Sequence, residues 1–174
     1  MDKKILAATV ESRIYESPKT YDSVRYLCYE AKTFGFHSVQ VFPNMIEMCT
    51  EILDGSDVKI CALGAYPHGG MTIEQKAFEA RDSVAKGAQE LDIREMKAVR
   101  EAVPNAVVKF NIEIEDLNRD EIALACRCAK EAGVDYITTS TGLYHIVDEN
   151  LNDVPLVCKV EDIAYIKRCL AGSS

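Results

Sequence analysis

The stretch Val107-Val-Lys-Phe-Asn-Ile-Glu113 decides how the rest of the chain is interpreted. Its apolar side chains alternate with polar ones, which is the two-residue period of a β-strand. One face is apolar, and the other carries Lys109, Asn111 and Glu113. In a parallel sheet covered by helices, such a polar row points into a barrel or a crevice. Burial there lowers the pKa of an amine towards that of a neutral nucleophile, whereas on an edge strand the lysine would simply extend to solvent.

The composition is that of a globular protein, and we expect one domain over residues 1–174 with a sizeable core. The net charge of −8 argues against a nucleic-acid partner, although a local pocket can still bind a phosphorylated substrate. No segment approaches the length of a membrane span, and the opening MDKKILAATV has too short an apolar run for a signal peptide. These features predict a cytoplasmic protein without a membrane partner.

The cysteines and histidines do not follow the spacing of a metal site. None of the seven cysteines forms a CxxC pair, and most lie in apolar contexts, which is typical of small core residues in a reducing compartment. We therefore expect neither a metal nor another cofactor.

Apolar strand-like runs alternate with amphipathic helical stretches along the chain. The expected strands are 5–10, 37–42, 59–65, 90–93, 107–113, 135–139 and 154–159. The expected helices are 18–34, 45–53, 72–86, 94–103, 119–132 and 161–170. This order predicts an α/β, TIM-barrel-like fold, and because a complete barrel needs about 250 residues, we expect a trimmed barrel of about seven strands. An open doubly wound sheet is the alternative.

Several motifs occur in an order that points to one family. They are Gly35-Phe-His-Ser-Val-Gln-Val-Phe-Pro43, Leu63-Gly-Ala-Tyr-Pro-His-Gly69, Gly87-Ala-Gln-Glu-Leu-Asp92, Val108-Lys109 and Ala132-Gly-Val-Asp-Tyr-Ile-Thr-Thr-Ser-Thr-Gly142. In their order and in their residues they resemble the motifs of the deoxyribose-phosphate aldolase family, a TIM-barrel class of Schiff-base aldolases. The likeness covers about residues 20–142.

The resemblance implies roles for two central residues. Lys109 matches the lysine that forms the imine with the donor aldehyde, and Asp92 matches a carboxylate of the proton relay. Because Asp92 lies between Leu91 and Ile93, alternation places it on the face opposite those apolar side chains. The alternative is a structural lysine, ion-paired with Asp92 or Glu113.

The resemblance also implies positions that contact the substrate. Gly142 matches part of the phosphate-binding loops, and Lys159 corresponds approximately to a seventh-strand lysine that could supply positive charge. The terminal Gly172, Ser173 and Ser174 echo a phosphate motif of the family, although they could equally be an addition to the natural chain.

The chain departs from the family pattern at several positions. Thr138 stands where the family carries a second lysine, which helps to lower the pKa of the Schiff-base amine. The resemblance places Thr138 among the residues expected to contact the substrate or its phosphate. Ala7 aligns with an expected first-strand carboxylate, and Gln40 stands in place of a cysteine. About twenty residues are missing between the fourth strand and its helix, and 140–153 lacks a helical pattern.

The resemblance implies a metal-independent Schiff-base aldolase for 2-deoxyribose 5-phosphate or a related small sugar phosphate, weakened by the missing lysine. A degenerate relative acting as a binding or assembly subunit is the alternative, and another sugar-phosphate enzyme on the same barrel is a third. An incomplete barrel leaves unpaired strand edges, so we also expect a homo-oligomer.

Overall fold

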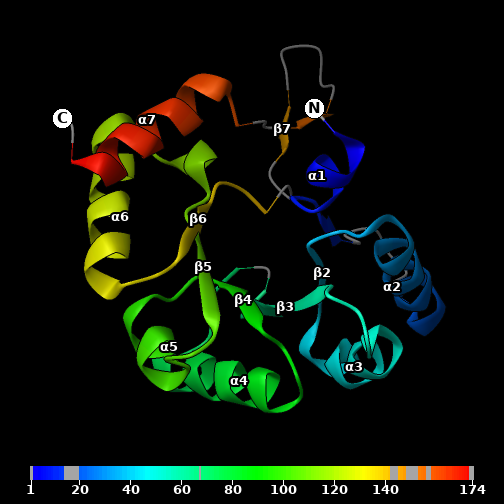
Figure 1. The fold of residues 1–174 in the computed structure, drawn as a ribbon. Coiled ribbons are helices and arrows are strands. Elements are labelled where there is room, and N and C mark those ends of the chain that lie inside the picture. The colour runs from blue at the N-terminus through cyan, green and yellow to red at the C-terminus, as the bar shows by residue number, and fades with distance from the viewer. Residues whose placement is uncertain are drawn as a thin grey trace.

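The computed structural model describes residues 2–13, 20–66, 68–141, 145–147, 153–155 and 158–172. Six parallel strands form a sheet that curls into a half-barrel, with helices on its outer side (Figure 1). The strands are β1 (Glu11–Arg13), β2 (Ser38–Val41), β3 (Lys59–Gly64), β4 (Glu90–Ile93), β5 (Val107–Asn111) and β6 (Tyr136–Thr138).

The strand order decides between the two predicted architectures. Neighbouring strands follow one another in chain order from β1 to β6. A doubly wound sheet would instead reverse its order at a switch point. The TIM-barrel-like prediction is therefore confirmed, with six strands in the sheet where about seven were expected.

Helices connect the successive strands, as the alternating pattern predicted. They are α2 (Tyr21–Phe34), α3 (Ile46–Leu53), α4 (Ile73–Ala85), α5 (Lys97–Ala102) and α6 (Arg119–Ala132). Two short 3₁₀ turns accompany them: η1 (Pro43–Met45) precedes α3, and η2 (Ile114–Asp116) follows β5. Thr72 and Gln75 form a capping box at the start of α4, since the side chain of each accepts from the backbone N–H of the other. Gly133 ends α6 in the left-handed conformation, which glycine adopts more easily than other residues.

The beginning of the chain differs from the prediction. Residues 5–10 do not form a strand: α1 (Lys3–Ala7) occupies most of this stretch, and the first strand lies further along, at Glu11–Arg13. The side chain of Asp2 accepts from Lys4 N at 3.0 Å and caps the helix. A short apolar run fits a helix and a strand equally well, so periodicity could not separate them. Ile5 is 62% exposed, which a central barrel strand would not allow.

The main hydrophobic core lies between the outer face of the sheet and the helices. Each strand from β2 to β5 contributes a buried residue to this core, and these residues are Val39, Ile60, Leu91 and Val108. Helix residues close the layer, including the buried Cys28 and Cys49. All seven cysteines are free, and four of them are buried.

The end of the chain leaves the sheet. β7 (His145–Val147) and β8 (Asp153–Pro155) pair antiparallel in a separate two-stranded sheet, and α7 (Val160–Ala171) then packs on α6 around Ile122, Cys126 and Ile166. The predicted strand 154–159 is therefore largely wrong, because β8 ends at Pro155 and Lys159 is the N-cap of α7. Within the described residues β6 has one strand neighbour, β5, so the sheet does not close. None of the helices in these ranges has the length and apolar character needed to cross a bilayer.

Candidate active site

The polar face of the half-barrel is produced by alternation along two central strands. On β4, Leu91 and Ile93 join the outer core, so Glu90 and Asp92 face inward. On β5, Val108 faces outward and Lys109 faces inward. The register pairs Asp92 with Lys109, so the two residues predicted as catalytic are direct neighbours across the ladder.

The ammonium of Lys109 is held by two carboxylates. It forms an ion pair with Glu11 and a second one with Glu90 at 2.7 Å, and its side chain is 9% exposed. Burial disfavours the charged amine, but Cys61 and the two carboxylates outweigh it and raise the pKa of Lys109 above its usual range. The prediction of a lowered amine pKa is therefore wrong for this state, because it counted burial and omitted the counter-ions.

The partners of Lys109 also differ from those expected. Its ammonium binds neither Asp92 nor Glu113, the ion-pair partners that the sequence suggested. Glu11 was missed because the first strand was placed at 5–10, which aligned Ala7 with the expected carboxylate. With β1 at 11–13, Glu11 itself supplies a carboxylate on the first strand.

Neighbours on β2 hold Glu11 in position. Ser38 Oγ donates to its carboxylate at 2.8 Å, and Gln40 Nε2 donates at 3.3 Å. Burial alone would raise the pKa of Glu11, but the charge of Lys109 and these surroundings lower it below the usual range. The carboxylate therefore stays ionised and keeps the amine charged.

Asp92 occupies a different hydrogen-bond environment from Glu11. Gln40 Nε2 donates to it at 2.9 Å and Thr138 Oγ1 donates at 3.1 Å. Burial raises the pKa of Asp92 and the nearby charge of Glu11 adds to this, which the two hydrogen bonds only partly offset. Thr138 therefore contacts Asp92 through a hydrogen bond and brings no positive charge to this cluster.

A small cavity lies beside Asp92. It encloses about 20 Å³ and is also lined by Tyr66, Arg94, Asn111 and Thr141. A cavity of this size and polarity has room for about one water molecule.

Arg94 and Glu113 close the rim of the half-barrel at the carboxyl ends of the strands. Arg94 Nη2 lies 2.6 Å from Glu113 Oε1, and Glu113 also accepts from Thr141 N at 2.8 Å. Glu113 has a φ of 46°, outside the strand, so the polar row predicted for 107–113 ends at Asn111. A non-glycine residue held in this left-handed conformation needs compensating contacts, and these hydrogen bonds supply them. Sequence reasoning missed Arg94, because only the tertiary pairing reveals it.

One group of described residues gathers potential metal ligands. The ligand atoms of Glu11, Cys61 and Glu90 lie within 4.8 Å of one another. The ammonium of Lys109 contacts both carboxylates, so this cluster already contains a cation. We therefore assign it no metal.

The remaining predicted positions are not brought to this site within the described residues. Lys159 is exposed at the start of α7, and no hydrogen bond or ion pair links its side chain to Lys109 or Asp92. Gly142, Ser173 and Ser174 lie outside the described ranges.

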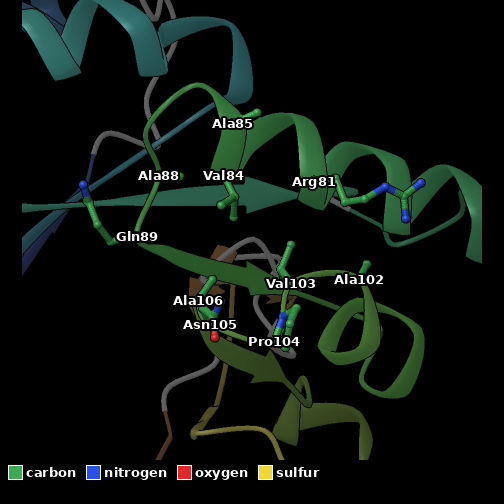
Figure 2. A pocket seen from close by; sticks show the side chains of 10 residues that line it. All are labelled: Arg81, Val84, Ala85, Ala88, Gln89, Ala102, Val103, Pro104, Asn105 and Ala106. Carbon is green, nitrogen blue, oxygen red and sulfur yellow. The ribbon is translucent and has the colours of Figure 1, made fainter.

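A larger hollow lies at the opposite end of the strands. It encloses about 490 Å³ beside Ala88 and Gln89, which precede β4, and Ala106, which precedes β5 (Figure 2). Gln89 is engaged there, since its side-chain oxygen accepts from Ile60 N at 2.8 Å. Barrel enzymes place their chemistry at the carboxyl ends of the strands, and the titratable cluster lies on the inner face, so this hollow is not the candidate active site.

Comparison with known proteins identifies the family. No protein-family model matches the chain. A deoxyribose-phosphate aldolase of Clostridium perfringens is 37% identical over 159 residues, which span 82% of this chain and 71% of that protein. The chain belongs to the deoxyribose-phosphate aldolase family. A deoxyribose-phosphate aldolase of Clostridium kluyveri is 34% identical over 174 residues, covering 90% of this chain and 79% of the relative.

Solved structures of this aldolase family share the fold. A Coccidioides immitis protein classed with these aldolases superimposes with a TM-score of 0.87 at 25% identity, covering 100% of this chain and 71% of that one. The deoxyribose-phosphate aldolase of Aeropyrum pernix, described as a tetramer, gives a TM-score of 0.74 at 27% identity over 82% of this chain and 67% of that one. The family and the lyase class predicted from the motifs are confirmed.

Proposed function

We propose that this chain is a Schiff-base aldolase that reversibly cleaves 2-deoxyribose 5-phosphate or a closely related sugar phosphate. The observation that carries this proposal is Lys109, a buried amine that faces inward beside Asp92 in a member of this aldolase family. A lysine at such a position can attack an aldehyde carbon when it loses its proton.

The reaction begins on the nitrogen of Lys109. The neutral amine adds to the aldehyde carbon C1 of the open-chain sugar, water leaves, and the protonated imine acts as an electron sink. Breaking the C2–C3 bond sends its electron pair towards that nitrogen, while the C3 hydroxyl loses its proton. A phosphorylated three-carbon aldehyde departs, and the remaining enamine takes a proton at C2. Hydrolysis then releases acetaldehyde and restores the amine.

Asp92 is the base that fits the proton transfers. Its carboxylate faces the same interior as Lys109 and borders the cavity that has room for about one water. Since burial raises its pKa, it exchanges protons closer to neutral pH than an exposed aspartate does. Gln40 and Thr138 orient it.

Two carboxylates work against this chemistry at neutral pH. Glu11 and Glu90 stabilise the charged form of Lys109, so only a small fraction of the amine is free. The expected enzyme is slow at pH 7 and faster under alkaline conditions. Thr138 cannot relieve this, because it adds no positive charge.

The test is reductive trapping. The protein is incubated with acetaldehyde and sodium borohydride at pH 7 and pH 9, and the adduct is located by peptide mass spectrometry. An added ethyl group on Lys109, more abundant at pH 9, is the expected result. Absence of an adduct at both pH values, together with no cleavage of 2-deoxyribose 5-phosphate, would refute the proposal and leave a binding or assembly role.

Further properties of the molecule belong to the same proposal. The unpartnered edge of β6 in the described sheet supports a homo-oligomer. A single domain over residues 1–174 and a cytoplasmic location stay predictions from the sequence. Substrate contacts by Thr138, Gly142, Lys159, Ser173 and Ser174 stay predictions that follow from the resemblance.

A further inference from the structure

His37 directly precedes β2, at the amino end of the strands, and its imidazole contacts the buried cluster around Lys109. Its Nε2 lies 2.8 Å from Oε1 of Glu90, the first residue of β4. The other oxygen of that carboxylate, Oε2, lies 2.7 Å from the ammonium nitrogen of Lys109. One carboxylate therefore joins the imidazole to the amine on which the proposed reaction depends.

These three side chains lead from the solvent to the interior. The side chain of His37 is 46% exposed, whereas those of Glu90 and Lys109 are 5% and 9% exposed. Histidine is the residue type whose charge ordinarily changes between about pH 5 and 8. An exposed imidazole exchanges its proton with the solvent, so the charge at position 37 changes with pH while it contacts a buried carboxylate.

The charge of His37 opposes the effect of Glu90 on Lys109. A neutral imidazole leaves the negative charge of Glu90 to stabilise the ammonium. A protonated imidazole pairs with the same carboxylate and repels the ammonium, so a larger fraction of the amine is free. Because Glu90 and Lys109 are buried, salt screens this interaction less than it screens a surface pair.

Other titratable groups on the neighbouring strands face the same cluster. They are Glu11 of β1, Cys61 of β3, Asp92 of β4 and Tyr136 of β6. Lys59 begins β3 at the same end of the sheet and is exposed, and its backbone N–H donates to the carbonyl oxygen of His37 at 2.9 Å. All these groups stay in place when His37 is substituted. Comparing variants at one pH therefore isolates the charge at position 37.

We propose that His37 is a positioning residue for the aldolase reaction, which sets through Glu90 how strongly the ammonium of Lys109 is held. This inference rests on the proposed function. His37 lies at the amino end of β2, whereas barrel enzymes bind their substrates at the carboxyl ends of the strands. The residue therefore acts on the amine from the end opposite to the substrate.

The first experiment compares a constant neutral and a constant charged side chain at position 37. Cleavage of 2-deoxyribose 5-phosphate is measured at pH 6 and pH 9, at constant ionic strength. We expect His37→Gln to be about three- to tenfold slower than the parent protein at pH 6 and equal to it at pH 9, where histidines are neutral. His37→Lys should equal the parent at pH 6 and exceed it by a similar factor at pH 9. This factor corresponds to a change of about half a unit to one unit in the pKa of Lys109.

The matched control is Lys59→Gln, which removes an exposed charge at the same end of the sheet. Among the described residues Lys59 forms no ion pair with Glu90, so its substitution should change the rate by less than about twofold at both pH values. A loss at pH 6 as large as that of His37→Gln would show a general effect of surface charge and overturn the proposal.

A double-mutant cycle tests whether Glu90 transmits the effect. In the Glu90→Gln background the rate difference between His37 and His37→Gln at pH 6 should shrink, because the carboxylate that both cations share is absent. An undiminished difference overturns the role of Glu90.

A chemical measurement separates this inference from the proposed function. Formaldehyde and cyanoborohydride methylate free amines, and mass spectrometry compares the methylation of Lys109 with that of the exposed Lys167. Methylation of Lys109 should follow the same order among the parent, His37→Gln and His37→Lys at each pH. Such an order in a protein without aldolase turnover supports the link from His37 to Lys109 and refutes only the proposed function. Equal methylation in all three proteins at both pH values overturns the link.

Discussion

The two faces of the six-stranded sheet are made from alternate residues of the same strands, yet they differ in what they contribute. The outer face presents Leu91 and Val108 to the helices, and these residues lie in the main core. The inner face, one residue away in each strand, presents Asp92 and Lys109. A side-chain period of two is what allows one strand to serve both purposes.

Packing therefore stabilises the sheet on its outer face, and the inner face carries the reactive side chains. Apolar packing on the outer face needs only volume and hydrophobicity. On the inner face each charge depends on a particular partner, and the balance between Glu11, Glu90 and Asp92 around one lysine sets whether the amine is free. Substitutions on the two faces should therefore affect different measurements, and the following predictions test that separation.

The largest effect is expected from Lys109→Arg. Arginine keeps the positive charge for Glu11 and Glu90 but cannot form the imine, so the fold should survive while turnover falls by at least about a thousandfold. Aldolase rate and thermal unfolding are measured on the same preparation. Turnover close to that of the parent protein would show that the nucleophile is another residue.

On the outer face, Leu91→Ala should destabilise the protein by about 2–5 kcal/mol, because Leu91 is 1% exposed and the shorter side chain leaves a cavity. The rate per folded molecule should be unchanged. Urea unfolding measures the first quantity and a low-temperature assay the second. Leu124→Ala, at a position 52% exposed on α6, serves as the control with little expected change. A large loss of rate in folded Leu91→Ala would contradict the separation of the two faces.

Thr138→Lys would add a cation close to the inner cluster, since Thr138 already contacts Asp92. If the added charge lowers the pKa of Lys109 by two units, the free amine at neutral pH increases about a hundredfold. The expected result is a faster enzyme whose rate rises at lower pH than in the parent protein. Thr138→Met matches the length without the charge and should bring no gain. Equal rates for the two variants would mean that charge at this position does not control the amine.

Glu11→Gln should give the smallest change. Removing one of the two carboxylates lowers the pKa of Lys109, and a shift of about one unit raises the rate at pH 7 about tenfold. In the parent protein the rate should rise about tenfold per pH unit from about pH 7 to 9, while the amine is mostly charged. A pH–rate profile of both proteins is the measurement, and coincident profiles would exclude Glu11 as the residue that holds the amine charged.

The same variant tests the pH dependence of stability. Glu11 has a folded pKa below its unfolded value of 4.5, and Lys109 has one above its unfolded value of 10.5. The stability that the pair contributes is therefore complete between these two values. It is lost as the pH falls through the folded pKa of Glu11 or rises through that of Lys109. The difference in unfolding free energy between parent and Glu11→Gln should accordingly be constant from about pH 5 to 10 and shrink at lower pH.

The sequence by itself determined the repeating α/β order, the inward direction of Lys109 and Asp92, and the family. Each of these depends on local information: the period of two in 90–93 and 107–111, and the motifs in their order along the chain. Local patterns report which face a side chain occupies, because the backbone geometry of a strand fixes it. Local patterns do not distinguish a strand from a helix where a short apolar run has no period, as at 5–10.

Only the tertiary structure decided which charges meet. Glu11 lies 98 residues before Lys109 in the chain, and the Arg94 side chain meets Glu113 while its backbone carbonyl accepts a hydrogen bond from Lys76 Nζ. The pKa of an amine depends on burial and on charges within a few ångströms, and these oppose each other here. Burial could be inferred from the strand pattern, whereas the counter-ions could not, since their distance in space is set by the register and curvature of the whole sheet.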